Sequence, residues 1–177
     1  MKTSAKTPPT VDEILRGTAH ALTIFEPEAI AGFPLFLKRG KPYLECLATG
    51  KKRPARPEEI VRQLYLKMLM EKYGYPAGRI AIEEAVQRGS DIHDKLADIV
   101  IWDKDDPRAA YIIIERKKPR RSDGMEQLKS YCSAKGSPIG VWTNGGETIH
   151  LHRREPNHYR NLPDIPRADQ TLVRVAE

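Results

Sequence analysis

The sequence has few cysteines, few aromatic residues and no long apolar segment, and each shortage excludes a class of protein. Cys46 and Cys132 are its two cysteines; they are too few for a disulfide framework and follow no spacing typical of a metal site. No apolar run approaches the ~20 residues that a membrane-spanning helix needs. The polar N-terminus lacks the apolar centre of a signal peptide. We therefore expect a cytoplasmic protein with reduced thiols and no membrane partner.

What the sequence has in quantity is charge. Its 177 residues include 30 Lys and Arg against 24 Asp and Glu, which gives a formal net charge of +6 and a pI near 9.3. Hydrophobic residues make up 40% of the chain, enough for one folded domain with a charged surface. A basic balance favours a polyanionic partner, but many modestly basic proteins bind no nucleic acid.

The order of the predicted elements indicates an α/β fold, with helices packed on a mixed β-sheet. Pro57 suits the first turn of the clearest helix and Gly74 its end. We predict helices at residues 10–20 (with Thr10 as N-cap), 57–73 and 123–134. Strands are predicted at residues 35–37 and 43–47, which would form a hairpin, and at residues 79–85, 97–102, 110–114, 139–143 and 148–152.

Composition also divides the chain into three parts. Residues 1–9 are polar and contain two consecutive prolines, which predicts a flexible N-terminus. Residues 10–155 contain the predicted elements and would form the domain. Residues 156–177 are polar and proline-rich, which is typical of a C-terminal tail or a linker.

Three charged residues stand at the ends of two adjacent apolar strands. Asp98 lies near the start of one strand, and Glu115 and Lys117 follow the apolar residues of the next. Side chains alternate along a strand, so Glu115 and Lys117 would share one face while Arg116 points away. If the two strands pair as a hairpin, Asp98 and Glu115 can converge.

Such a grouping suits a magnesium-dependent hydrolase. Mg²⁺ prefers oxygen ligands and keeps several waters, so two carboxylates suffice beside a phosphate. The ion lowers the pKa of a bound water, and a nearby lysine can orient that water and stabilise developing charge. Gln127 and Tyr131 lie four residues apart on the following helix, where they could bind phosphate or position Lys117.

Each residue taken singly has a commoner explanation. Asp98 alone would be a strand-end acid, Glu115 and Lys117 an ordinary ion pair, and Tyr131 a core aromatic residue. The ordered set of an acid on one strand, Glu-X-Lys on the next and Gln-X-X-X-Tyr on a helix favours a site.

These residues resemble the N-terminal nuclease domain of type I restriction enzyme R subunits, a member of the PD-(D/E)XK superfamily. The resemblance extends over about residues 40–153 and is made of five short motifs in the family's order. They are Pro57-Glu58-Glu59-Ile60-Val61-Arg62-Gln63, Ala97-Asp98-Ile99-Val100, Glu115-Arg116-Lys117-Lys118-Pro119, Gln127 with Tyr131, and Thr143-Asn144-Gly145.

The resemblance implies a restriction-endonuclease-like α/β/α sandwich and Mg²⁺-dependent cleavage of double-stranded DNA, with Mn²⁺ as a possible substitute. It implies that Asp98 and Glu115 hold the metal and that Lys117 serves the attacking water. Glu59 would be a supporting metal ligand, in preference to Glu58. Gln127 and Tyr131 would form the motif shared with RecB-like nucleases. The sequence departs from the superfamily pattern where Ala97 replaces the nominal proline before Asp98.

The implied partners are DNA, an ATP-dependent translocase or helicase module and other restriction-modification subunits. The sequence contains no Walker glycine-lysine loop, so the chain would be either an excised domain or a short stand-alone protein. Two other functions stay open: a DNA-binding or assembly module that keeps the fold without catalysis, and a nuclease acting on RNA or branched DNA. Basic clusters could track phosphates or simply form a solvated face; they are Lys51-Lys52-Arg53, Arg56, Lys117-Lys118, Arg120-Arg121 and Arg153-Arg154.

Overall fold

The computed structural model describes residues 6–20, 22–85, 96–117 and 123–172, and these form two β-sheets and four α-helices. The larger sheet has six strands in chain order, with β6 and β7 parallel and the other neighbours antiparallel. It is therefore a mixed sheet, as the sequence predicted. Its strands are β4 (Ile80–Ala85), β5 (Leu96–Trp102), β6 (Ala110–Arg116), β7 (Ile139–Thr143), β8 (Thr148–Glu155) and β9 (His158–Leu162).

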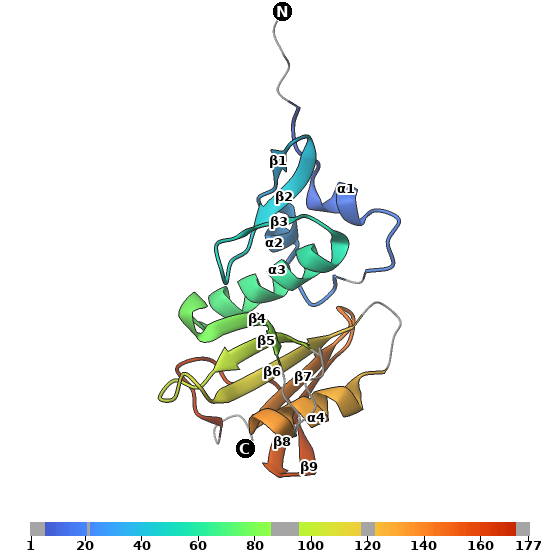
Figure 1. Ribbon diagram of the computed structural model, residues 1–177. Coiled ribbons are helices and arrows are strands. Elements are labelled where there is room, and N and C mark those ends of the chain that lie inside the picture. The colour runs from blue at the N-terminus through green and yellow to red at the C-terminus, as the bar shows by residue number, and fades with distance from the viewer. Residues whose placement is uncertain (1–5, 21, 86–95, 118–122, 173–177) are drawn as a thin grey trace, which may run out of the picture.

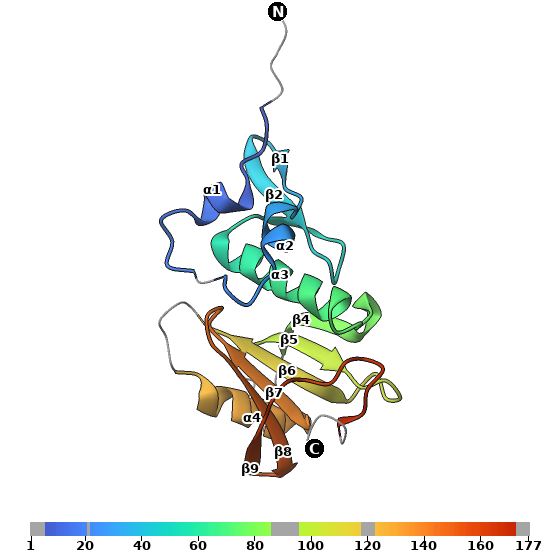
Figure 2. The same cartoon turned by 180° about the vertical axis from the view of Figure 1, so that it is seen from behind.

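Two helices cover opposite faces of this sheet (Figure 1, Figure 2). Helix α3 (Pro57–Glu71) packs Ile60, Leu64 and Leu69 into one apolar cluster with the isoleucines of β5 and β6 that point to its side. Helix α4 (Met125–Lys135) packs Leu128 and Cys132 into a second cluster on the other face. The central strands are apolar because both of their faces are buried.

The boundaries of the two helices follow their local signals. Pro57 begins α3, and the acidic Glu58 and Glu59 lie in its first turn, where they complement the positive end of the helix dipole. Gly136 ends α4 in the left-handed conformation, with φ at 68°. The predicted helices at residues 57–73 and 123–134 are confirmed to within two residues at most of their ends.

A second, three-stranded sheet lies beyond α3 (Figure 1). It consists of β1 (Phe36–Lys38), β2 (Lys41–Glu45) and β3 (Lys52–Pro54), all antiparallel. The predicted hairpin is confirmed, whereas β3 was expected to be a connector. The short helices α1 (Val11–Leu15) and α2 (Pro27–Ala31) precede this sheet, and Thr10 caps α1 by accepting a hydrogen bond from the Glu13 backbone.

The segment after β8 packs on the body of the protein. Strand β9 extends the large sheet, Ile165 is 3% exposed, and the Tyr75 hydroxyl donates to the Pro166 carbonyl at 2.6 Å. The polar sequence after residue 155 did not predict these contacts, and the domain boundaries themselves stay predictions. Residues 1–5 of the predicted flexible N-terminus lie outside the described part of the chain. No helix formed by the described residues is long and apolar enough to cross a membrane.

Candidate active site

The pairing of β5 with β6 brings the two predicted carboxylates to neighbouring positions. The strands are antiparallel, with Ile99 opposite Ile114. Asp98 and Glu115 come one row further, at the end of the paired region. The hairpin that the sequence predicted for these strands is therefore confirmed.

Glu115 is a buried carboxylate with one oxygen engaged. Its side chain is 8% exposed, and Oε1 lies 3.2 Å from Lys117 Nζ. Oε2 is buried and has no hydrogen-bond partner among the described residues. Burial raises the pKa of Glu115; Lys117 opposes the rise, while the charge of Asp98 adds to it and the Asp98 backbone lowers it. A buried, unsatisfied carboxylate oxygen is costly, and a cation would satisfy it.

Lys117 connects this carboxylate to helix α4. Its Nζ donates to Gln127 Oε1 at 3.1 Å, and Gln127 Nε2 donates in turn to the Tyr131 hydroxyl. The Lys117 backbone N–H donates to the Thr143 carbonyl at 2.8 Å, which fixes the start of the side chain beside β7. Glu115, Lys117, Gln127 and Tyr131 thus form one continuous polar chain, on the side of the sheet that α4 covers.

Gly124, just before α4, makes room for the lysine. It has φ at 96°, a conformation that strongly favours glycine, and an added Cβ would collide with Lys117 Cε. The sequence analysis missed this residue. A glycine just before a predicted helix is a weak signal, because its need depends on where Lys117 runs.

Asp98 turns toward the opposite side, to α3. Its Oδ1 lies 3.0 Å from Arg62 Nε, an ion pair without hydrogen-bond alignment, and its Oδ2 accepts from Arg116 Nε at 3.0 Å. Arg116 does point away from Glu115 and Lys117, as strand alternation predicted. The sequence analysis did not foresee that it would contact Asp98.

Glu59 lies near Asp98 through a shared arginine. Arg62 NH1 lies 3.4 Å from Glu59 Oε2, while Arg53 Nε of β3 lies 3.2 Å from the same oxygen. The other oxygen, Oε1, accepts from Gln63 at 2.8 Å. Glu59 is 8% exposed and Glu58 is exposed, in keeping with the preference for Glu59.

A further acid, Glu83, completes this arginine network. Its Oε1 lies 2.9 Å from Arg53 NH2 and 3.1 Å from Arg62 NH1. Burial lowers the pKa of Arg62, but the charges of Asp98, Glu59 and Glu83 outweigh that effect and raise it. Glu83 itself has φ at 54°, which is rare for a residue other than glycine. The three arginines are the functional candidates that the sequence analysis left unassigned, although Arg62 follows Glu59 at the spacing of one helix face.

The acids fit Mg²⁺ in their chemistry but are not arranged around one point. Glu115 Oε2 is available, whereas both Asp98 oxygens face arginines, so Asp98 must exchange a guanidinium for a metal. The described residues contain no group of three or more His, Cys, Asp or Glu side chains gathered as a metal site. The four acids and the four cations of the ion-pair network balance to a formal charge of zero.

These features define a mixed α/β protein in which acids and one lysine meet at the end of two paired central strands. The chain belongs to the family of the type I restriction enzyme R protein N terminus (HSDR_N), whose model matches residues 57–166. The resemblance predicted from the motifs is therefore confirmed. A comparison with curated proteins gave no match.

The matched range begins at α3 and continues past β9. It contains Asp98, Glu115 and Lys117, and leaves α1, α2 and the three-stranded sheet outside. The motif resemblance, drawn over residues 40–153, therefore began too early and ended too early. Lys118, Pro119, Arg120 and Arg121 lie outside the described residues. Membership of this family places the chain in the context of restriction-modification.

Proposed function

We propose that this chain is a Mg²⁺-dependent endodeoxyribonuclease domain with a restriction-endonuclease-like α/β/α sandwich. The observation that carries the proposal is the buried Glu115 carboxylate, with one free oxygen, held between Asp98 and Lys117 in a chain of this family. The DNA substrate and an ATP-dependent motor partner follow from the family's restriction context.

The side chains have distinct roles in the proposal. Asp98 and Glu115 would hold Mg²⁺, with Glu59 in support, and the bound ion would supply an activated water and charge stabilisation. Mn²⁺ would serve in its place, because it accepts the same ligands.

Lys117 would orient the attacking water and stabilise the charge that develops on the phosphate. Its ammonium is already held from two sides, by Glu115 and by Gln127. Tyr131 contacts Gln127, so this pair would restrict the lysine to one position. Fixing a catalytic group before the reaction reduces the cost of ordering it in the transition state.

Cleavage of supercoiled plasmid DNA tests the proposal, with Mg²⁺ or Mn²⁺ and with the cognate restriction subunits added. Lys117→Ala and Asp98→Asn are expected to reduce cleavage at least a hundredfold, at about the scale of losing one stabilising donor. The exposed Lys104 supplies a matched control, because Lys104→Ala removes the same charge from a loop. Cleavage that persists in both site variants, with unfolding temperatures unchanged, would refute the site.

One observation favours a second candidate, a DNA-binding or assembly module without catalysis. Both oxygens of Asp98 face arginines, as they would in a purely structural ion-pair network. That candidate predicts DNA binding that does not depend on metal, and no increase in unfolding temperature on adding Mg²⁺. The same plasmid assay with RNA and branched DNA substrates separates the remaining alternatives.

A further inference from the structure

The positive charge of the chain is concentrated in the three-stranded sheet. Residues 36–56, called here the basic ribbon, contain seven Lys and Arg and one Glu, a net charge of +6. The whole chain also has a net charge of +6, so the remaining residues balance to zero. This concentration, rather than the modest overall excess, is what a polyanion would meet. The seven are Lys38, Arg39, Lys41, Lys51, Lys52, Arg53 and Arg56.

The ribbon has an apolar inner face and a basic outer face. Leu44 and Cys46 point inward and are 0% and 1% exposed in the core around α3. Lys38, Lys41 and Lys52 are exposed, and strand alternation places them on the outer face. The inner face anchors the ribbon, so the basic face is held in a fixed orientation.

The cations of the ribbon are available for a ligand. Of its seven Lys and Arg, Arg53 alone forms an ion pair with the described residues. Lys38 Nζ lies 5.1 Å from the centre of the Tyr43 ring, and Lys52 Nζ lies 5.7 Å from that of Phe36. The ammonium groups therefore cover the rings, which favours contact with a phosphate backbone over stacking on bases.

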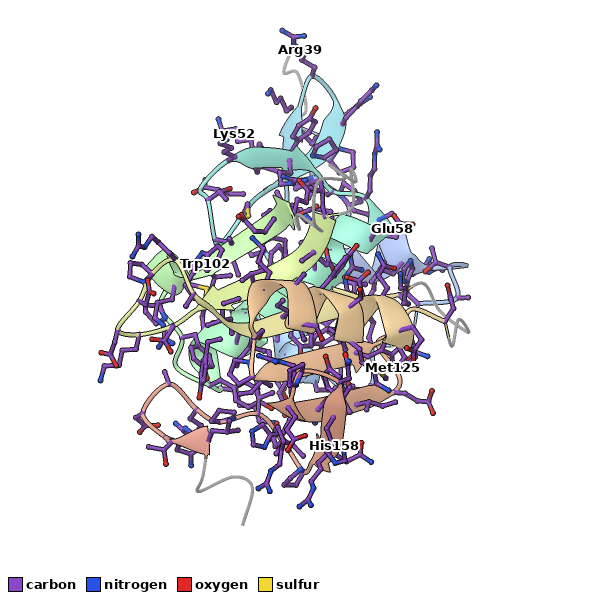
Figure 3. The ribbon with its side chains drawn as sticks, turned by 60° about the horizontal axis from the view of Figure 1, so that its bottom comes forward. Arg39, Lys52, Glu58, Trp102, Met125 and His158 are labelled. Carbon is purple, nitrogen blue, oxygen red and sulfur yellow. The ribbon has the colours of Figure 1, made fainter. Side chains whose placement is uncertain are left out.

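The tip of the ribbon keeps a charge at a conformational cost. Arg39 and Gly40 have φ at 51° and 76° and form the two-residue turn between β1 and β2. Asn or Gly suits the first of these positions better than Arg, by about 1 kcal/mol. Figure 3 shows Arg39 at the end of the ribbon that projects from the body, with Lys52 on its flank.

The base of the ribbon joins the candidate active site. Arg53 of β3 forms ion pairs with Glu59 of α3 and with Glu83 of β4. A groove lined in part by Arg53, Arg56 and Arg62 runs between the ribbon and α3. Arg62 in turn contacts Asp98, so a continuous series of basic side chains leads from the ribbon tip to the site.

We infer that the basic ribbon binds the phosphate backbone of duplex DNA and directs it toward the Asp98–Glu115 site. The inference rests on the proposed function for the choice of DNA as partner. It goes beyond that function because the ribbon lies outside the matched family range. Binding through backbone contacts would not depend on sequence and would weaken steeply with salt.

Fluorescence anisotropy with a labelled DNA duplex in EDTA tests this, because binding is then measured without cleavage. The ribbon variant combines Lys38→Gln, Arg39→Asn and Lys41→Gln. The control variant combines Lys104→Gln, Arg108→Gln and Arg167→Gln, which removes the same charge from exposed positions elsewhere. Asn tolerates the turn at position 39, so the ribbon variant should fold with an unchanged or higher unfolding temperature.

The ribbon variant is expected to bind roughly a hundredfold more weakly near 0.1 M salt, with a salt slope smaller by about three, since each lost phosphate contact removes ~0.9. The control should stay within about threefold of the wild type. Equal losses in both variants, an unchanged slope or tighter binding to a matched RNA duplex or single strand would overturn the inference. Cleavage that survives Lys117→Ala would refute the nuclease site alone, because binding in EDTA does not involve it.

Discussion

Replacing Arg116 by Gln should strengthen Mg²⁺ binding. Arg116 Nε lies 3.0 Å from Asp98 Oδ2, which is one of the oxygens that the metal would need. The substitution releases that oxygen and removes one positive charge from a network that is otherwise neutral. The Arg116 side chain is 9% exposed, so solvent screens its charge incompletely.

The size of the effect follows from electrostatics. Two unit charges 4 Å apart interact by about 4 kcal/mol at an effective dielectric constant of 20 and by about 1 kcal/mol in water. Arg62 still holds the other Asp98 oxygen, so we take the lower part of this range. We expect about 1.4 kcal/mol, which corresponds to roughly tenfold tighter binding.

Thermal unfolding across a series of Mg²⁺ concentrations measures this change. A tenfold gain in affinity adds up to about 1.4 kcal/mol of stabilisation at saturating metal, or roughly 3–6 °C for a domain of this size. Arg116→Lys keeps the charge and should behave like the wild type. Adding Glu115→Gln to the Arg116→Gln variant should abolish the metal-induced shift. An Mg²⁺ response in Arg116→Gln no larger than that of the wild type would show that Asp98 is not a ligand.

Three other substitutions test particular contacts. Gly124→Ala should displace Lys117 and reduce cleavage at least tenfold, and a cleavage rate equal to the wild type would contradict the proposed seat of the lysine. Gly140→Ala, whose methyl would lie 2.9 Å from a buried cysteine sulfur, should lower the free energy of unfolding by about 1–3 kcal/mol in urea titrations. Gly78→Ala, with open space around it, should not lower it. Burial lowers the pKa of His150 below its usual 6.5 despite a nearby aspartate, so the stability it contributes is present above pH 6.5 and lost as pH falls. His150→Gln should therefore flatten the dependence of unfolding midpoints on pH between about 5 and 8.

Most of the central fold was predictable because its signals are local. The apolar runs of β5, β6 and β7 are buried on both faces, and such strands have no other common explanation. Proline at the start of α3 and glycine after it marked that helix. Strand alternation also correctly placed Glu115 and Lys117 on one face.

The edges of the fold were less predictable. Strand β9 is mostly exposed, so its sequence is polar and resembles a tail. Strand β3 is short and basic for the same reason: its charged side chains point to solvent while its backbone pairs with β2. In both cases backbone hydrogen bonds, rather than side-chain burial, define the strand.

The arginine contacts at Asp98 could not be read from the sequence because they join three separate elements. Arg62 comes from α3, Arg116 from β6 and Asp98 from β5, and only the packing of α3 on the sheet brings them together. Local pattern gave Arg116 its direction but not its partner. Conversely, Glu115 has a buried oxygen without a partner, which local pattern also cannot show.

The neutrality of the ion-pair network links metal binding to DNA binding in the proposed enzyme. Mg²⁺ alone would leave two uncompensated positive charges in a largely buried site, which is unfavourable. A DNA phosphate supplies negative charge, and guanidinium groups released from Asp98 are well suited to bind it. Metal and DNA would therefore each increase the affinity for the other by the same factor, as thermodynamic linkage requires. On this reasoning the arginines at Asp98 hold the site closed to metal until a phosphate backbone, directed by the basic ribbon, replaces the carboxylate as their partner.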